Sequence, residues 1–143
     1  GVIRGGYCLE AAVGEGPRIN LLGSGTILFE VMEAASRLRQ EGFAVAVYSI
    51  TSYIELARDA EQAADSKVAS WVSQLFPESN VPTVAASDYV RTLPRMIASW
   101  LPGPLMALGT DGFGMSERRE ALRAHFRIDA HAIADTARAM VND

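Results

Sequence analysis

A glycine-rich turn separates a short apolar run from the start of a helical pattern, in the stretch INLLGSGTIL at 19–28. Turns of this kind between a strand and a helix hold phosphate groups in many α/β proteins, because the first amides of the helix are free to bind an anion. The candidate anion-binding residues in this turn are Ser24, Gly25 and Thr26.

The turn carries no complete nucleotide fingerprint. A dinucleotide site needs a third glycine where Leu28 stands, and an acidic residue at the end of the next strand, which instead ends in Tyr48-Ser49-Ile50. No Lys-Ser/Thr pair follows the glycines, so a P-loop is excluded as well. Two interpretations stay open: an anion at the helix N-terminus near Thr26, or a tight turn that lets the helix pack on the sheet. We favour the second.

A second glycine-containing loop, GTDGFG at 109–114, is the next candidate for chemistry. Its Asp-Gly pair matches the beginning of a thiamine diphosphate signature, but that signature needs an asparagine pair further along, and only Asn142 stands near the right distance. Loops after parallel strands face the functional crevice of a doubly wound sheet, so Asp111, Phe113 and Ser116 are candidates for ligand contact. A purely structural role is an equally open alternative, in which the glycines shape the loop and Asp111 and Ser116 bind local amides.

Polar residues also begin the helix expected after the second buried strand. Ser52 can cap this helix, and Glu55 stands three residues later, which is the spacing of a capping box. Both would lie at the edge of the crevice, whereas Arg58 and Asp59 are expected to form a solvated face. With one cysteine and two histidines the chain cannot build a zinc cluster of the usual ligands, so we expect no catalytic residue and no metal site in this chain.

The elements that must position these residues alternate along the chain. Apolar and β-branched runs predict strands at 18–22, 43–50, 82–87 and 105–109, with an edge strand possible at 2–12. Helices are predicted from Thr26 to Glu41, after Ser52, over 88–101 with a break at Pro94, over 117–126 and after Asp129. This alternation indicates an α/β fold with a mainly parallel sheet covered on both faces.

The composition limits which classes of protein this chain can belong to. The chain has 143 residues, of which 49% are hydrophobic and 21% charged, so we expect one domain over 1–143 with a packed core. The net charge is −4 and the basic residues are scattered, which argues against nucleic acid as a partner. Apolar stretches are too short to span a membrane. The single cysteine fits a reducing cytoplasm, which is the location we expect.

Four blocks in collinear order resemble the C-terminal domain of the homodimeric pyruvate dehydrogenase decarboxylating component: LLGSGTIL, VYSITSYIELARD, VAASDYVR and LGTDGFGMSERREALRAHFRID. The last block is also similar to transketolases more broadly, through Asp111, Phe113, Gly114, Ser116, Leu122, Phe126 and Ile128. This resemblance implies a three-layer α/β/α fold. Its sheet would be mostly parallel and five-stranded, with one antiparallel strand, and the N-terminal stretch would join or flank this sheet.

The resemblance also implies that the chain is a fragment of a longer enzyme. Members of this family bind thiamine diphosphate and magnesium in two preceding domains, across a homodimer interface, and transfer an acyl group from a 2-oxo acid to a lipoyl acyltransferase. The C-terminal domain would complete the dimer and shape the active-site entrance, and would be inactive alone. A face exposed by the missing partners, with Trp71 or Trp100, is then expected.

Two departures from the family pattern leave the substrate open. The segment 60–80 lacks the Trp-Asn and His-Pro elements of the family, and Met115 replaces a usual basic residue, so another 2-oxo acid than pyruvate is an alternative. A transketolase-type ketol transfer enzyme is a second alternative. A third is a stand-alone module that holds an anion or small ligand at Ser24–Thr26.

Overall fold

The computed structural model describes residues 4–88, 91–109 and 128–142. Its strands are β1 (Gly6–Glu10), β2 (Arg18–Gly23), β3 (Ala44–Ile50), β4 (Thr83–Ala86) and β5 (Leu105–Leu108). Its α-helices are α1 (Leu28–Gln40), α2 (Tyr53–Ser66), α3 (Trp71–Leu75), α4 (Thr92–Arg95) and α6 (Ala130–Asn142). Two 3₁₀ turns, η1 (Gly25–Ile27) and η2 (Ala98–Trp100), complete the described elements.

The five strands form one sheet in the order β1-β3-β2-β4-β5. Strand β2 lies at its centre and pairs in parallel with β3 and with β4, and β4 pairs in parallel with β5. Strand β1 pairs with β3 in the antiparallel direction at the edge. The predicted mostly parallel, five-stranded sheet with one antiparallel strand is therefore confirmed.

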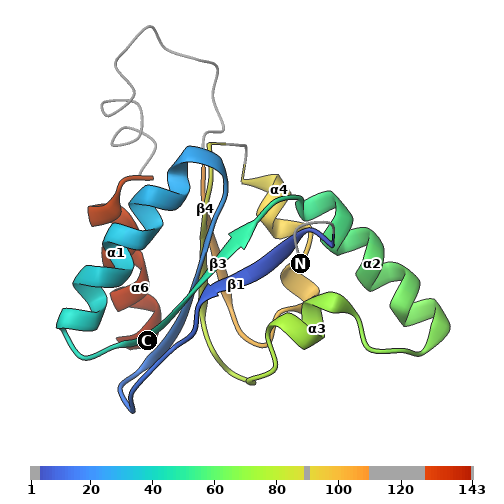
Figure 1. Cartoon of the computed structure of the whole chain (residues 1–143), viewed down its shortest axis with the longest axis horizontal. Coiled ribbons are helices and arrows are strands. Elements are labelled where there is room, and N and C mark those ends of the chain that lie inside the picture. The colour runs from blue at the N-terminus through green and yellow to red at the C-terminus, as the bar shows by residue number, and fades with distance from the viewer. Residues whose placement is uncertain (1–3, 89–90, 110–127, 143) are drawn as a thin grey trace, which may run out of the picture.

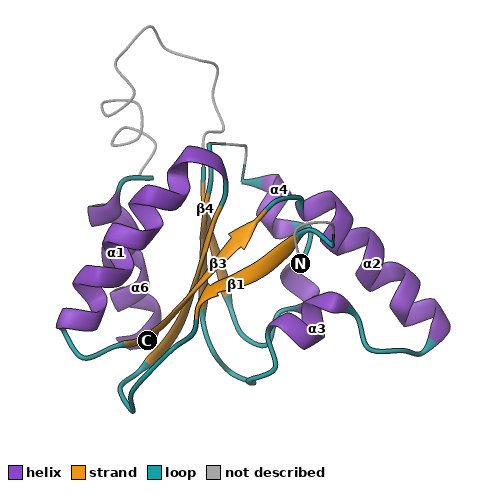
Figure 2. Cartoon of the chain, viewed as in Figure 1, coloured by secondary structure: helices purple, strands orange, loops and turns teal. Residues whose placement is uncertain are grey.

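Helices cover both faces of this sheet (Figure 1; Figure 2). Helices α1 and α6 pack on one face and α2, α3 and α4 on the other, so the fold has three layers. Successive side chains along each strand point to opposite faces of the sheet, so the hydrophobic core is divided into two clusters, one on each face. Leu21 belongs to the α1/α6 core and its neighbour Leu22 to the α2/α3 core, and both are fully buried. Because both faces of β2 and β3 are buried, both strands are mainly apolar instead of alternating between apolar and polar residues.

Gly23 permits the close approach of α1 to the sheet. A Cβ atom at this position would lie 2.8 Å from Cδ1 of Leu28 and 3.0 Å from Cγ2 of Val31. The glycine therefore serves packing, as the favoured interpretation of the turn expected. The helix itself starts later than predicted, because Gly25–Ile27 form the 3₁₀ turn η1 before α1 begins at Leu28.

The predicted helix over 88–101 is replaced by two short pieces, α4 and η2. Pro94 explains the break expected there, because its ring is incompatible with a regular helix interior. The bonds from the Met96 amide to the Leu93 carbonyl and from Ile97 to Pro94 tighten the chain into 3₁₀ geometry. After residue 60 the chain continues α2 to Ser66 and then forms α3.

Helix α6 follows its prediction closely. The Ala132 amide donates to Oδ1 of Asp129 at 2.8 Å, so Asp129 caps the helix. Ile133 and Ala137 are fully buried on the face that meets α1. No helix in the described ranges is both long and apolar enough to cross a lipid bilayer.

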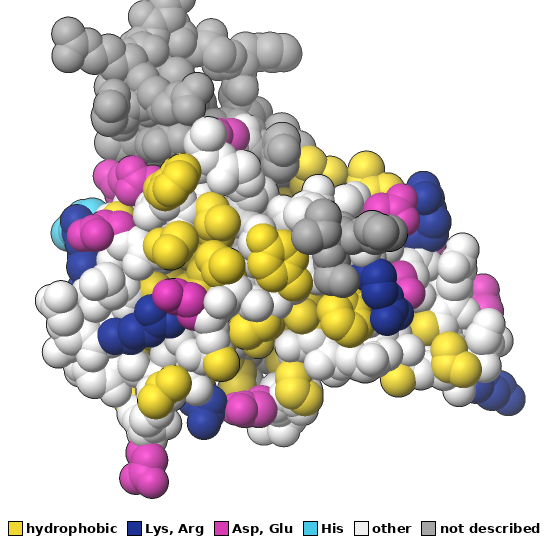
Figure 3. All heavy atoms as spheres, in the orientation of Figure 1, with side chains coloured by type: hydrophobic (Ala, Val, Ile, Leu, Met, Phe, Trp, Pro, Cys, Tyr) yellow, Lys and Arg dark blue, Asp and Glu magenta, His cyan; other side chains and the backbone are white. Residues whose placement is uncertain are grey.

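Several large apolar side chains of the described residues are exposed. They are Leu9, Val13, Phe29, Met32, Ile54, Val68, Met96 and Met106. Figure 3 shows hydrophobic side chains gathered over α1 and the neighbouring sheet edge. Trp71 and Trp100 are half-buried against the α2/α3 core. Both rings pack in part inside this chain, and the expectation that Trp71 or Trp100 belongs to a face that meets the missing partners stays a prediction.

Candidate functional site

The candidate site lies at the carboxyl ends of β2 and β3. The chain leaves β2 toward α1 on one face of the sheet and leaves β3 toward α2 on the opposite face. Adjacent parallel strands whose helices diverge in this way open a crevice at their carboxyl ends, which is where α/β proteins bind ligands. Five of the residues singled out from the sequence meet there: Ser24, Gly25, Thr26, Ser52 and Glu55.

The three candidate residues in the turn after β2 have different surroundings. Gly25 has a φ of +58° and open space around it. Oγ1 of Thr26 donates to Oδ2 of Asp88 at 3.0 Å, which joins the turn after β2 to the segment after β4. The side chain of Ser24 makes no cap hydrogen bond to η1 and is buried. The turn η1 is three residues long and runs directly into α1, and an anion at Ser24–Thr26 stays a prediction.

Ser52 and Glu55 form half of the expected capping box. The Glu55 amide donates to Oγ of Ser52 at 3.1 Å, so Ser52 caps α2 as predicted. The reciprocal half is absent: the Ser52 amide donates to the Gly5 carbonyl at 3.0 Å, and Oε1 of Glu55 accepts from Arg58 at 2.7 Å. Gly5, directly before β1, therefore accepts the bond that the glutamate would have accepted.

A small cavity of about 160 Å³ opens in this crevice. Ser24, Tyr53 and the first residues around the α2 N-terminus line it, together with Ile50 and Leu93. The hydroxyl oxygens of Ser24 and Tyr53 are closed off from solvent and lie near one another, with no other hydrogen-bond partner in the described structure. Burial raises the pKa of the Tyr53 phenol, with a smaller opposite effect from the nearby Ser24 hydroxyl. Tyr53 therefore stays protonated and able to donate.

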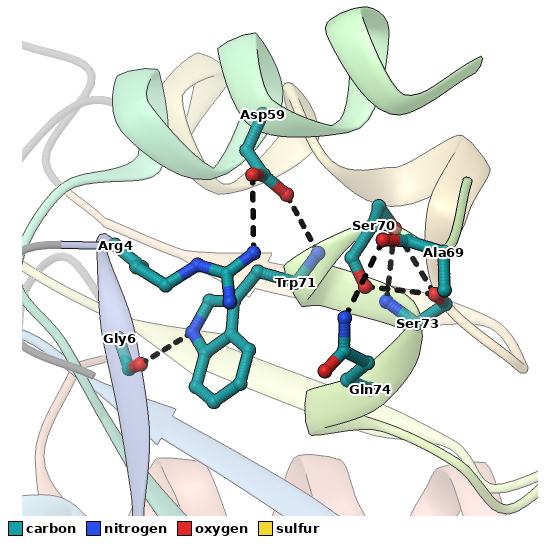
Figure 4. Close-up of polar contacts among 8 residues, drawn as sticks. All are labelled: Arg4, Gly6, Asp59, Ala69, Ser70, Trp71, Ser73 and Gln74. Atoms are coloured by element: carbon teal, nitrogen blue, oxygen red, sulfur yellow. Dashed lines mark hydrogen bonds and ion pairs between the residues drawn. The ribbon is translucent and has the colours of Figure 1, made fainter. Parts of the chain in front are cut away.

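A cluster of polar contacts joins α2 to α3 and to the N-terminal segment at β1 (Figure 4). Asp59 on α2 accepts from the Trp71 amide at 2.6 Å and from Arg4 at 3.3 Å. The indole of Trp71 donates to the Gly6 carbonyl at 2.9 Å and lies 4.5 Å below the Arg4 guanidinium. The prediction of a solvated Asp59 is wrong, because this carboxylate joins α2 to the start of α3 and to the segment before β1.

A second cavity, of about 150 Å³, lies at the opposite edge of the sheet. An ion pair between Arg18 and Glu78 at 3.2 Å borders it. Burial raises the pKa of the Cys8 thiol and raises that of Tyr48 to about 12, so neither side chain is an activated nucleophile. This edge carries the amino ends of the parallel strands, away from the crevice.

Three predicted site residues, Asp111, Phe113 and Ser116, lie outside the described residues. Among the described ones, sequence reasoning missed Tyr53 and Asp88. Tyr53 begins the apolar helical pattern that continues at Leu56, Ala57 and Ala60, and its burial could have been expected from that spacing. Asp88 follows β4 directly, at the same edge of the sheet.

The described residues do not fit a thiamine cofactor or its metal ion. In the described ranges no three His, Cys, Asp or Glu side chains come together to hold a metal. The crevice cavity of about 160 Å³ is also smaller than the roughly 300–1,000 Å³ of typical cofactor and ligand sites. No step of cofactor chemistry is therefore assigned to this chain.

Comparison with known proteins gives consistent matches over nearly the whole chain. Residues 5–129 match the transketolase-like TK C-terminal domain family. The pyruvate dehydrogenase E1 component of Escherichia coli K12 is 36% identical over 147 aligned positions, which cover 96% of this chain. That of Corynebacterium glutamicum is 38% identical over 143 positions, 93% of the chain. The chain spans 16% and 15% of these two relatives' lengths.

Solved structures show the same fold at lower identity. A transketolase from Leishmania mexicana superimposes with a TM-score of 0.70 at 22% identity, over 99% of this chain and 18% of that protein. A split-gene transketolase, described as an inactive β4 tetramer, superimposes with a TM-score of 0.62 at 18% identity, over 96% of this chain and 42% of its own. The three-layer architecture is thus shared with these proteins.

Proposed function

The chain belongs to the transketolase-like C-terminal domain family, and on this premise we propose that it is the C-terminal domain of a thiamine diphosphate-dependent 2-oxo acid dehydrogenase of the pyruvate dehydrogenase type. The observation that carries the proposal is the 36–38% identity to pyruvate dehydrogenase E1 components over more than nine-tenths of the chain. The solved transketolases reach 17–22%. Such a dehydrogenase decarboxylates a 2-oxo acid oxidatively and passes the acyl group to a lipoyl group.

In this proposal the domain is a structural part of the enzyme. The cofactor and magnesium belong to preceding domains, and this chain contributes the polar crevice edge of Ser24, Thr26, Ser52 and Glu55 to the surroundings of the active site. Its partners would be those domains, a second copy of the enzyme and a lipoyl acyltransferase. A cytoplasmic location goes with this function. Exposed apolar residues on α1, Phe29 and Met32, are available for such contacts.

The test uses the full-length product of the gene that encodes this chain. We expect it to reduce an artificial electron acceptor with pyruvate or another 2-oxo acid, and to show no ketol transfer from a ketose phosphate. Comparing pyruvate with 2-oxobutanoate and with a branched 2-oxo acid in the same assay identifies the substrate. Ketol transfer without 2-oxo acid oxidation would overturn the proposal in favour of a transketolase-type enzyme.

The 143-residue chain alone provides the complementary measurement. We expect no decarboxylase activity and no heat of binding when thiamine diphosphate and magnesium are titrated into it, because the described residues offer no site for either. Binding at micromolar concentration would contradict the assignment of the cofactor to other domains.

A further inference from the structure

The cavity at the amino ends of the parallel strands lies on the face of the sheet that carries α2 and α3. Ala44 and Ala46 of β3 line it, and their small side chains leave space above the sheet. Phe76 and Val81, in the segment between α3 and β4, line it as well. Its volume of about 150 Å³ is close to the roughly 150 Å³ of an engineered cavity that binds benzene, so a ligand of about six heavy atoms fits.

Asn20 on β2 contributes a carboxamide to this cavity. Its side chain points to the same face of the sheet as that of Leu22, two residues further along the strand, which belongs to the α2/α3 core. In the strand register Asn20 lies beside Ala46. The residue is only 7% exposed, and no other side chain or backbone group in the described ranges hydrogen-bonds its carboxamide.

Both polar atoms of the Asn20 carboxamide are open to the cavity. In the described part of the chain, the unpaired side-chain atoms that are closed off from solvent are the hydroxyl oxygens of Ser24, Tyr53 and Thr83, and the atoms of Asn20 are not among them. Thr83 stands opposite Asn20 on β4, but its hydroxyl makes no hydrogen bond and so does not pair with the carboxamide. Because buried polar groups are nearly always paired, this carboxamide needs a partner inside the cavity.

The phenol of Tyr48 is a second polar group at the cavity. Tyr48 is 6% exposed, and its ring centroid lies 4.5 Å from that of Phe76. Its hydroxyl has no hydrogen-bond partner in the described residues and is not closed off from solvent. Burial raises the pKa of this phenol to about 12, with smaller effects from Cys8 and Glu78, so the hydroxyl stays protonated and able to donate.

The charges around the cavity compensate one another. Of its lining residues, Arg18 and Glu78 are charged, and they form an ion pair at 3.2 Å with both side chains about half exposed. The buried groups that face the cavity, a carboxamide and a phenol, are neutral. A charged ligand would lose its hydration there without meeting a free opposite charge, so the cavity favours an uncharged ligand.

The carboxamide also selects the polar groups of the ligand. It presents an acceptor, Oδ1, beside a donor, Nδ2, so a ligand with an N–H next to a C=O can pair with both atoms at once. A cyclic amide holds its N–H and C=O on the same edge of the ring, which is the arrangement that this pairing needs.

We propose that this cavity binds a small uncharged cyclic amide of about six heavy atoms. The N–H of the ligand would donate to Oδ1 of Asn20, and its carbonyl would accept from Nδ2 of Asn20 and from the Tyr48 hydroxyl. Its ring would lie against Ala46 and Phe76. The site goes beyond the proposed function, because it gives this domain a ligand of its own, apart from the cofactor and substrate of the complete enzyme.

The probe is 2-pyrrolidinone, and the comparison ligand is γ-butyrolactone, which has the same size and shape but a ring oxygen in place of the N–H. Each is titrated into the ¹⁵N-labelled 143-residue chain while amide chemical shifts are followed. We expect 2-pyrrolidinone to bind with a Kd of about 1 mM and to shift the amides of Asn20 and Ala46. The lactone should bind at least tenfold more weakly, because its ring oxygen leaves Oδ1 of Asn20 unpaired.

Two variants remove the polar groups of the cavity. Asn20→Leu keeps the size of the side chain and should weaken 2-pyrrolidinone binding at least tenfold, whereas Tyr48→Phe should weaken it about threefold. Matched controls are Asn142→Leu, exposed at the end of α6, and Tyr53→Phe, at the other cavity, which should both bind normally. The thermal midpoint of Asn20→Leu should be unchanged or higher, since the carboxamide has no partner among the described residues.

The comparison of the two ligands on the wild-type chain does not depend on the variants folding. Equal binding of lactam and lactone, normal binding by Asn20→Leu, or no amide shift up to about 50 mM 2-pyrrolidinone would each overturn the proposal. The last result would mean that the cavity holds water only.

The same two ligands are compared on the full-length gene product by ligand-observed NMR, which does not require the 143-residue chain to fold alone. We again expect the lactam to bind and the lactone to bind more weakly. Binding by the 143-residue chain without binding by the full-length product would also overturn the proposal, because another part of the enzyme would then fill the cavity. None of these outcomes affects the assay with 2-oxo acids, so the two proposals fail independently.

Discussion

Gly23 and Gly25 stand two positions apart, and different physical constraints select glycine at each. At Gly23 the constraint is space, since an added Cβ would approach Leu28 and Val31 at 2.8 and 3.0 Å. At Gly25 it is the backbone, which has a φ of +58° with nothing nearby. A sequence motif that scores both glycines as phosphate-binding residues cannot separate these causes, which is why the turn resembled a nucleotide loop.

We predict that Gly23→Ala destabilises the protein by about 1–3 kcal/mol, because α1 must move away from β2 to admit the methyl group. Gly25→Ala should cost only about 1 kcal/mol, from the left-handed backbone alone, and Gly25→Asn less, since asparagine tolerates that conformation. Urea unfolding of the three variants measures these differences. Equal costs for Gly23→Ala and Gly25→Ala would contradict a packing role for Gly23.

At the scale of elements, the two helices on one face of the sheet are joined by charge as well as by their apolar stripes. Glu41, directly after α1, accepts from Nε of Arg138 on α6 at 2.7 Å. Arg138 also donates to Asp135 one turn earlier in the same helix. These bonds fix the C-terminal end of α1 against α6, beside the buried contacts of Ile133 and Ala137.

This contact predicts a pH dependence. The hydrogen bond from Arg138, helped by its charge, holds the pKa of Glu41 below the ordinary 4.5, so the folded state binds this proton less readily than the unfolded chain. The stabilising contribution is therefore fully present above about pH 4.5 and is lost as the pH falls through the lower folded pKa.

We expect Glu41→Gln to be less stable than wild type at pH 7, and we expect the difference to narrow as the pH falls toward 3, because protonation of Glu41 removes the charge that the variant lacks. Chemical unfolding at the two pH values checks this, with Glu61→Gln, exposed on α2, as the control. A Glu41→Gln deficit that is the same at both pH values would show that the ion pair makes no contribution.

The sequence predicted those features that depend on residues close together in the chain. The caps at Ser52 and Asp129, the break near Pro94 and the buried strands β2 and β3 depend on a few neighbouring residues each. The contacts of Asp59 were not predicted, because its partners, Arg4 and the Trp71 amide, come from other parts of the chain. The spacing of residues along a helix gives no information about such distant partners. Tyr53 became part of the site only when β2 brought Ser24 beside it.

On the scale of the whole molecule, one sheet separates two cores. The order β1-β3-β2-β4-β5 places the crevice where the chain changes faces, and the first two blocks that carried the family resemblance run from strand to helix across that edge. The number of strands and the presence of one antiparallel strand came from the resemblance. The strand order was not predicted, because alternation of strands and helices alone does not say which strands are neighbours. The contacts of Asp111, Phe113 and Ser116 stay predictions.

If the shared sheet makes the two cores one cooperative unit, a substitution on one face must lower the unfolding midpoint of the other face as well. Both tryptophans pack on the α2/α3 core, whereas Ile19 is fully buried in the α1/α6 core. We predict that Ile19→Val lowers the free energy of unfolding by about 0.5–1.5 kcal/mol and shifts the tryptophan fluorescence and far-ultraviolet circular dichroism transitions equally.

The matched variant Ile97→Val removes the same methyl group from the tryptophan side, where Ile97 is fully buried. It should shift both transitions by a similar amount. A fluorescence midpoint that stays in place in Ile19→Val while the circular dichroism midpoint falls would show that the faces unfold separately. The α2/α3 face, which carries Tyr53, would then keep its fold when the α1/α6 core is lost.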